Sequence, residues 1–266
     1  MVSASKLRRA QEAQVKAKLY ARRLTDLISR LSLYDQETTH PLLTHREKAK
    51  KVLILVITSD KGLCGSFNHA VNKRVLAWIG DHKAQFAGID LSFCGRRGHT
   101  HLKTAAKVNK YYEHVTDKPQ YAKAVEISDE LCQLFLRGEY DEVYLAYNVY
   151  NSALSQKPTI EKILPIEANI LEKRKEATSL LYIFEPSAAD VLATLIPKYL
   201  HFHVYFALLE NAAGEHGARM SAMDSASRNT RDLIDRYTLL RNRVRQNSIT
   251  KELIEIISGV ETLNRG

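Results

Sequence analysis

The residues best placed to do chemistry lie in a glycine-rich turn. The turn, Ser59-Asp-Lys-Gly-Leu-Cys-Gly-Ser-Phe-Asn68, follows a β-branched run and precedes an amphipathic stretch, where phosphate-binding loops usually lie. Its spacing matches neither GxxxxGKS/T nor GxGxxG. The next predicted strand ends in Cys94-Gly-Arg96, without an acidic residue to bind a ribose. We therefore favour a tight strand-to-helix turn, in which the glycines supply backbone freedom, over a nucleotide site.

The candidate metal ligands are two histidine pairs, His99/His101 and His201/His203. Residues two apart on a helix point to different faces, and no third ligand stands nearby at a useful spacing, which argues against zinc. The three cysteines form no CxxC pair, which favours a reduced, cytosol-facing protein. No GxSxG elbow or Cys/His arrangement indicates a nucleophile. We expect no catalysis, no metal and no cofactor on this chain.

A polar group near the C-terminus, Arg245, Gln246, Thr250 and Glu252, could bind the carboxylates and carbonyls of a partner protein. The same residues also fit a solvated helix face with an i,i+4 pattern of Arg or Lys and Glu. Spacing alone favours the solvated face.

Helices with heptad seams are predicted at both ends of the chain. The first seam, spaced 3-4-3-4-3-4-3, comprises Leu7, Ala10, Gln14, Ala17, Ala21, Leu24, Ile28 and Leu31. The last comprises Thr230, Leu233, Tyr237, Leu240 and Val244 and then, after a five-residue step, Ile249, Leu253, Ile256, Val260 and Leu263. Pro197 predicts a break or kink in the last helix. Such a helix would be about 115 Å long, so it must project from any domain of this chain.

The middle of the chain reads as alternating strands and helices. Continuous or β-branched runs predict strands at 51–58, 89–94 and 141–150, with further candidates at 159–164 and 180–184. Helical stretches run to about Phe86, follow Gly98, and span 119–137 with Gly138 as a C-cap. We predict an α/β protein in which residues 1–46 and 187–266 form a long antiparallel two-helix coiled coil. Residues 47–186 then form a central, mainly parallel, Rossmann-like sheet domain.

The chain of 266 residues carries a net charge of +9, and its two ends are more basic than its middle. Such ends should meet something acidic, whether nucleic acid, an anionic membrane surface or acidic loops of a partner. The sequence has no secretory signal. It also has no run of 18 apolar residues, which argues against a membrane span.

Five motifs, in order and spread over the whole chain, resemble ATP synthase gamma subunits. They are Met1–Gln11, the glycine turn Ser59–Asn68, Ser152–Pro158, Glu210–Asn229 and Asn242–Gly259. The resemblance implies a coiled-coil axle inside a ring of alpha and beta subunits, with a sheet domain that binds the epsilon subunit and the membrane rotor ring. It places the nucleotide sites on the partners and implies no nucleic-acid binding. It also implies a peripheral location on an energy-coupling membrane, bacterial inner (cytoplasmic side) or mitochondrial inner, through the complex only.

The resemblance also assigns a role to the C-terminal polar group. In the family, the positions matching Arg245, Gln246, Thr250 and Glu252 touch the beta subunit, whose acidic loop would suit the basic helices. Lys251 stands where a glutamine is common in the family.

The family's first helix usually begins before the methionine that matches Met1. Equal rise per residue along the two helices would put Met1 level with about residue 230, leaving the later seam without a partner helix. We expect a fragment or a misassigned start. The runner-up interpretation is a basic coiled-coil nucleic-acid-binding protein, whose affinity would fall steeply with salt. A dehydrogenase-like enzyme stabilised by a dinucleotide comes third.

Overall fold

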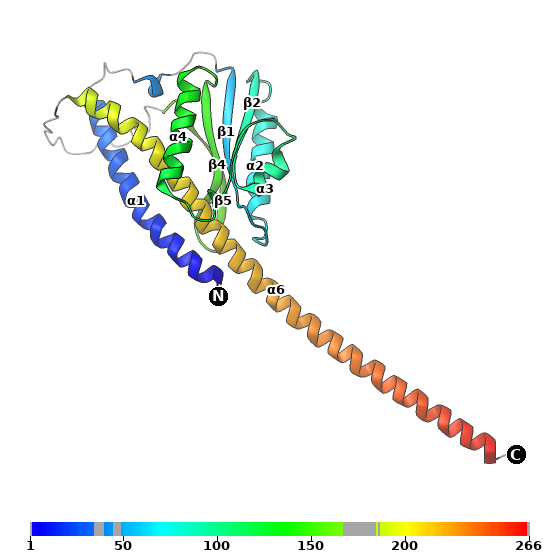
Figure 1. Cartoon of the computed structure of the whole chain (residues 1–266). Coiled ribbons are helices and arrows are strands. Elements are labelled where there is room, and N and C mark those ends of the chain that lie inside the picture. The colour runs from blue at the N-terminus through cyan, green and yellow to red at the C-terminus, as the bar shows by residue number, and fades with distance from the viewer. Residues whose placement is uncertain (1, 35–39, 45–48, 167–184, 186, 265–266) are drawn as a thin grey trace. The chain divides into compact units, whose positions relative to one another are not determined.

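The structure, a computed structural model, describes residues 2–34, 40–44, 49–166, 185 and 187–264 (Figure 1). The chain divides into two units, Met1–Ser221 and Ala222–Gly266, which we describe in turn. The domain boundaries predicted from the sequence fall at or beside residues outside the described ranges, and they stay a prediction.

The first unit is built on a five-stranded sheet in the order β3-β2-β1-β4-β5. Its strands are β1 (Lys51–Ile57), β2 (Gly88–Cys94), β3 (Lys107–Tyr112), β4 (Glu142–Tyr150) and β5 (Gln156–Leu164). Neighbouring strands are parallel except β4 and β5, which are antiparallel. The mainly parallel sheet predicted from the sequence is therefore confirmed. The strand candidate at 180–184 lies outside the described residues.

The strand β3 was not predicted. The helical stretch expected after Gly98 lasts only to the end of α3 (Arg96–Leu102), and the chain then returns to the sheet. β3 lies at the edge of the sheet and reads Lys-Val-Asn-Lys-Tyr-Tyr, with no buried position. An edge strand needs no continuous apolar run, so hydrophobic pattern gives it no signal.

Helices cover both faces of the sheet (Figure 1). Because side chains alternate along β1, Val52, Ile54 and Val56 pack with α2 (Phe67–His82) and α3 in one core. Leu53, Leu55 and Ile57 face the opposite core, which contains residues of α1, α4 and α6. The helix α4 (Tyr121–Leu136) ends as predicted, since Gly138 has φ 76° and its N–H donates to the Phe135 carbonyl at 3.0 Å.

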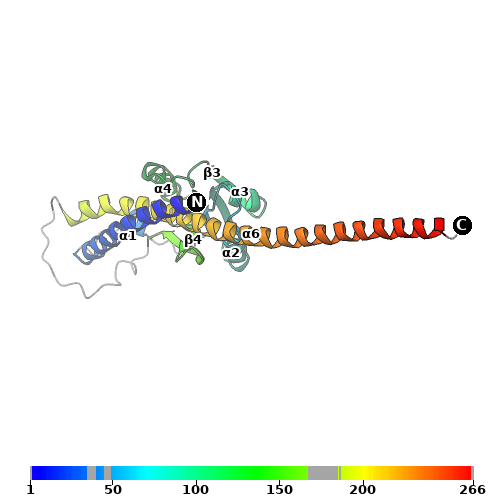
Figure 2. The same cartoon turned by 90° about the horizontal axis from the view of Figure 1, so that it is seen from below.

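The terminal helices α1 (Val2–Tyr34) and α6 (Ala188–Asn264) lie side by side in both views of Figures 1 and 2. Gln14 Nε2 donates to Glu210 Oε1 at 2.6 Å, and the rings of Tyr20 and Phe202 lie 4.8 Å apart. Residue numbers rise along α1 as they fall along α6, so the pair is antiparallel, as predicted. Most of the predicted seam of α1 is buried: Leu7, Gln14, Ala17, Leu24 and Ile28.

Of the break or kink expected near Pro197, the break does not occur, because α6 continues through this residue, and the kink stays a prediction. Proline in a helix interior costs about 3 kcal/mol, and burial of Leu192, Ile196 and Leu200 on the same helix offsets that cost. By length and composition alone, a window within Asp190–Val260 could cross a membrane, contrary to the reading of the sequence. Of that window, 39% is buried inside the protein, and one such helix is weak evidence of a membrane span.

The second unit, Ala222–Gly266, is the C-terminal part of α6. Every side chain from Met223 through Val260 is exposed. We expected exposure from about residue 230. The earlier onset follows from the register of the helix pair, in which Gln14 already lies opposite Glu210.

Candidate functional site

The four polar residues predicted to bind a partner all lie on α6 and are all exposed: Arg245, Gln246, Thr250 and Glu252. At about 100° per residue, Arg245 and Glu252 share one side of the helix, two turns apart. Gln246 and Thr250 share another side, one turn apart. The helix therefore separates them into two pairs rather than one cluster. Among the described residues, none of these four side chains forms an ion pair, whereas Lys251 Nζ lies 3.8 Å from Glu255 Oε1.

An exposed apolar stripe runs between the two pairs. Its members recur at the spacing predicted for the shifted seam and are 46–63% exposed: Ile249, Leu253, Ile256 and Val260. Exposed apolar side chains also occur in the earlier part of the seam, where Tyr237 is 66% exposed. Contiguous exposed apolar surface is typical of protein-binding sites.

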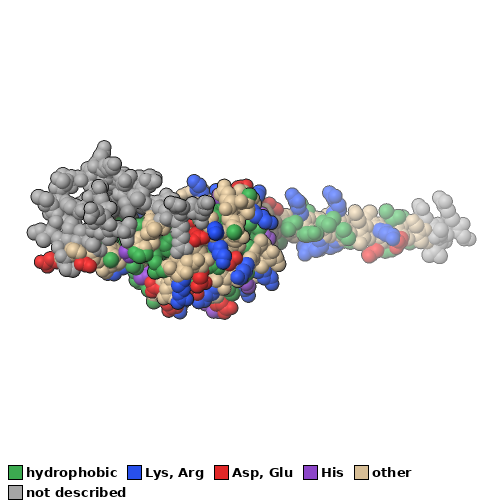
Figure 3. Space-filling view, turned by 90° about the horizontal axis from the view of Figure 1, so that it is seen from above, with side chains coloured by type: hydrophobic (Ala, Val, Ile, Leu, Met, Phe, Trp, Pro, Cys, Tyr) green, Lys and Arg blue, Asp and Glu red, His purple; other side chains and the backbone are tan. Residues whose placement is uncertain are grey.

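Basic side chains accompany the stripe. Figure 3 shows Lys, Arg and acidic side chains beside hydrophobic ones on the C-terminal part of α6. The arginines of residues 222–245 outnumber the acidic residues Asp224, Asp232 and Asp235, and one of them, Arg228, pairs with Asp224 at 3.0 Å. The basic segment 222–245 therefore precedes the stripe along α6, and the two together suit a partner whose surface is both acidic and apolar.

A second constellation joins α6 to the glycine turn after β1. The Arg219 guanidinium donates to the Gly62 carbonyl oxygen from Nε at 3.3 Å and from Nη2 at 3.2 Å, and Nη2 also donates to Glu215 Oε1 at 2.6 Å. The side chains of Arg219 and Glu215 are only 16% and 3% exposed. We call Gly62, Glu215 and Arg219 the turn clamp.

Burial shapes the charges of the turn clamp. It raises the pKa of the Glu215 carboxyl, and the Arg219 guanidinium acts in the opposite direction. Burial, together with the positive charge of Arg219, lowers the pKa of the neighbouring His216 to about 4. His216 is therefore neutral at neutral pH, and Arg219 supplies the positive charge beside Glu215.

Two asparagine side chains bond to backbone carbonyls at the two ends of the glycine turn. Asn211 Nδ2 donates to the Thr58 carbonyl at 3.2 Å, and Asn148 Nδ2 donates to the Phe67 carbonyl at 3.0 Å. A Cβ on Gly214 would lie 2.8 Å from the Phe67 ring, so only glycine permits this approach. Residues 59–68, which we interpret as a structural turn, thus make specific contacts with α6.

The structure brings three of the five resembling motifs together. Besides the glycine turn and residues 210–219, the segment 152–158 takes part, since a Cβ on Gly217 would lie 2.9 Å from Ala153 Cα. The sequence had not identified the buried carboxylate of Glu210, which accepts from Gln14 Nε2 and from the Tyr150 N–H. Its signal was present, because Gln14 is a polar residue in an otherwise apolar seam.

His201 and His203 contact different elements, as expected of residues two apart on a helix. His201 Nε2 lies 2.6 Å from Asp129 Oδ1 of α4, whereas His203 Nδ1 lies 3.6 Å from Glu161 Oε1 of β5. His99 stacks on Tyr111 with ring centroids 4.7 Å apart. Within the described part of the chain, no three His, Cys, Asp or Glu residues are grouped to hold a metal.

The cysteines of the described chain are free and buried: Cys64, Cys94 and Cys132. Burial raises the pKa of each thiol, that of Cys132 to about 12. Thiols of this kind are poor nucleophiles at neutral pH.

Comparison with known proteins connects these features to one family. A family model described as ATP synthase matches residues 1–263. The ATP synthase gamma chain of Geobacter metallireducens is 44% identical over 263 residues, covering 99% of this chain and 91% of that protein. That of Pelotomaculum thermopropionicum is 43% identical, covering 98% and 90%.

Solved structures are similar over most of the chain. A chain from the central stalk and c-ring of Tetrahymena thermophila mitochondrial ATP synthase has a TM-score of 0.62 and 26% identity. The match covers 85% of this chain and 96% of that one. A chain of the Euglena gracilis mitochondrial ATP synthase also has a TM-score of 0.62, at 17% identity, covering 100% and 94%. At that identity, the second likeness concerns the fold alone.

Proposed function

Because this chain belongs to the family of ATP synthase gamma chains, we propose that it is the central rotor shaft of an ATP synthase catalytic head. It couples proton flow through the membrane ring to conformational cycling of the catalytic beta subunits, in ATP synthesis or hydrolysis. The observation that carries this function is the C-terminal part of α6, which is exposed from Met223 to Val260 and presents a basic segment followed by the apolar stripe. The nucleic-acid interpretation has no support from the comparisons.

The two regions of the chain contact different partners. The shaft, residues 1–46 and 187–266, meets the alpha and beta subunits, and the sheet domain, residues 47–186, meets the epsilon subunit and the rotor ring. The chain is non-catalytic, because nucleotide and Mg²⁺ sites lie on the partner subunits. It is a peripheral protein of the energy-coupling membrane, on the cytoplasmic side of a bacterial inner membrane, and reaches the membrane through the complex.

Torque must pass from the sheet domain into α6. The turn clamp supports this role, because a buried charge-assisted hydrogen bond and two bonds to the Gly62 carbonyl oppose sliding of α6 along the sheet. Glu210, held by Gln14 and by the Tyr150 N–H, opposes the same motion on the other side of α6. Both sets of bonds lie in the first unit, close to the point where α6 becomes exposed.

The polar residues flanking the apolar stripe are the proposed contacts with the beta subunit. Arg245 and Glu252 offer a donor and an acceptor on one side, and Gln246 and Thr250 do so on the other. A beta subunit with an acidic loop would pair with Arg245, and Glu252 would accept a hydrogen bond from the same partner surface. Because the pairs face different directions, a rotating shaft presents them to a given beta subunit in turn.

The function is tested by pull-down of this chain from detergent-solubilised membranes. We expect alpha, beta and epsilon subunits and the rotor ring to be recovered. Ile256→Asp places a charge in the exposed stripe and should reduce recovery of alpha and beta. The matched control Leu76→Asp changes an apolar residue of α2, 41% exposed, and should leave their recovery unchanged. Absence of alpha and beta from the wild-type pull-down would refute the proposal.

A further inference from the structure

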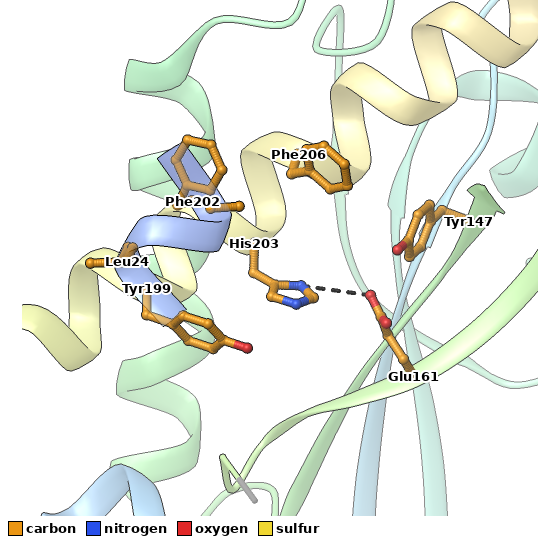
Figure 4. Close-up of a pocket in the computed structure, with 8 residues that line it drawn as sticks. Leu24, Tyr147, Glu161, Tyr199, Phe202, His203 and Phe206 are labelled. Carbon is orange, nitrogen blue, oxygen red and sulfur yellow. Dashed lines mark ion pairs between the residues drawn. The ribbon is translucent and has the colours of Figure 1, made fainter. Parts of the chain in front are cut away.

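Two cavities of the first unit differ in whether the chain itself pairs their polar groups. The cavity between the helix pair and the sheet has a volume of about 260 Å³. At its polar end, His203 of α6 faces Glu161 of β5 (Figure 4), and Nδ1 lies 3.6 Å from Oε1, so the carboxylate is paired internally. The cavity beside the glycine turn has a volume of about 400 Å³. It contains polar groups for which the described chain supplies no partner, and the rotor function does not use it.

This second cavity lies between α2, α3 and the glycine turn. Arg97 and His101 line it from α3, one turn apart, and His69 and Asn72 line it from α2 at a similar spacing. The imidazole rings of His69 and His101 are T-shaped to each other, with centroids 6.5 Å apart. The Arg97 guanidinium lies against the turn, because a Cβ on Gly62 would be 2.7 Å from its Nη2. The arginine and both histidines are exposed, so a ligand can reach them.

The side chains of this cavity offer hydrogen-bond donors that are not in use. Within the described chain, the Arg97 guanidinium forms no ion pair, and the amide of Asn72 forms no hydrogen bond although the residue is only 4% exposed. The Oδ1 atom of Asn72 is enclosed, which leaves Nδ2 as the end of the amide that is open to the cavity. Each imidazole carries at least one N–H donor in either tautomer. Buried donors without an acceptor are costly, so the cavity is built for a ligand that accepts hydrogen bonds.

The charges around the cavity favour a negatively charged acceptor. Its described lining residues include no Asp or Glu. Burial raises the pKa of the Cys64 thiol, which also lines the cavity, so the thiol stays neutral. Ser66 gives α2 no side-chain cap, which leaves the first N–H groups of that helix, at the positive end of its dipole, without such a partner. Unpaired donors, an arginine and the absence of an acid together indicate an anion.

We propose that this cavity binds a phosphate group, either as the free ion or as the end of a small phosphomonoester. Its oxygens accept hydrogen bonds from Arg97, from Asn72 Nδ2 and from the two imidazoles, and the planar guanidinium matches two phosphate oxygens at once. Sites for small molecules usually enclose about 300–1,000 Å³. A cavity of about 400 Å³ therefore leaves room for a short polar body. Its described lining has no Phe, Tyr or Trp ring on which a base could stack, which disfavours a nucleotide.

The competing explanation is diffuse attraction of anions by the net charge of +9. A diffuse field depends on how many basic residues the chain has rather than on which ones. Loss of any exposed arginine would then weaken phosphate binding to a similar degree. A built site instead depends on Arg97 and is indifferent to a distant arginine, and this difference can be measured.

The test is isothermal titration calorimetry on the purified full chain, in a phosphate-free buffer at constant ionic strength. The probes are inorganic phosphate, glycerol 3-phosphate and uncharged glycerol. We expect saturable binding of both phosphate compounds, with Kd of about 10 µM to 1 mM for a ligand of this size, and no binding of glycerol. Tighter binding of glycerol 3-phosphate than of inorganic phosphate identifies a phosphomonoester as the ligand, and otherwise the free ion is the ligand. Absence of saturable binding by both phosphate compounds, or equal binding of glycerol, would overturn the proposal.

Two substitutions and one matched control locate the site. Arg97→Gln should lower phosphate affinity at least about tenfold, as loss of a hydrogen bond from a charged group implies. Asn72→Leu keeps the approximate shape of the side chain without its donor and should lower affinity about three- to tenfold. The control Arg137→Gln changes an exposed arginine at the end of α4, on the opposite face of the sheet, and should leave affinity unchanged. Equal losses in Arg97→Gln and Arg137→Gln, or wild-type affinity in an Arg97→Gln protein shown by circular dichroism to be folded, contradict the assignment.

Discussion

Arg219→Met tests how firmly α6 is held to the sheet domain. The change keeps most of the apolar stem but leaves the Gly62 carbonyl and the Glu215 carboxylate, 3% exposed, without their donor. Breaking a buried ion pair costs about 3–5 kcal/mol. Because burial raises the pKa of Glu215, that carboxyl can take up a proton, which favours the lower end. We expect a loss of about 3 kcal/mol of unfolding free energy, or roughly 6–12 °C in Tm for a folded unit of this size.

The measurement is a double-mutant cycle by urea unfolding, followed by the fluorescence of the single tryptophan, Trp78. Replacing a buried ion pair by apolar residues of similar size is often nearly neutral. Glu215→Met/Arg219→Met should therefore be more stable than Arg219→Met alone by about 2 kcal/mol. If Arg219→Met costs less than about 1 kcal/mol, or if the double variant is the least stable of the set, the clamp does not hold α6 as we argue.

Three further predictions concern other parts of the molecule. The folded protein holds the pKa of His216 at about 4, against 6.5 ordinarily, so between these pH values the unfolded chain binds a proton that the fold excludes. Stability should fall by up to about 3 kcal/mol as pH drops through this window, and His216→Asn should remove that part of the slope in urea titrations. Gly214→Ala should destabilise by about 1–3 kcal/mol through its clash with an aromatic ring. Gly80→Ala, where a Cβ meets nothing within 4 Å, should stabilise by about 0.5–1 kcal/mol in thermal melts. Arg245→Ala should weaken binding of the alpha and beta subunits about 3–30-fold in quantitative pull-downs; comparable weakening by Arg231→Ala, on the same helix, would argue for diffuse charge rather than a specific contact.

The central elements of the fold are readable from the sequence because burial imposes a pattern on them. The strand at Val52–Ile57 is buried on both faces, which requires a continuous β-branched run. The first helix has one buried face, which requires the heptad seam. Where burial relaxes, as in β3 at the sheet edge, the pattern vanishes and prediction fails. Pro197 does not end the helix for the opposite reason, since packing overrides a local preference.

The candidate site was also predicted only in part from the sequence. The exposed stripe of α6 follows from spacing, and Ile249 and Leu253 lie where the shifted seam places them. Spacing cannot, however, show that Arg219 reaches the carbonyl of Gly62, 157 residues away in the sequence. Contacts of that kind depend on the register of α6 against the sheet, which the composition of neither segment specifies.

The Gln14–Glu210 hydrogen bond affects how the α1–α6 helix pair responds to mechanical force. One turn of slip between α1 and α6 would be about 5.4 Å, which would separate the two side chains and leave the buried Glu210 carboxylate with the Tyr150 N–H as its donor. Intermediate alignments of α1 and α6 are therefore higher in energy than the native one by more than the loss of a single bond. Under mechanical load the helix pair should stay locked until a turn of helix unwinds, so it should yield abruptly at a threshold force rather than creep.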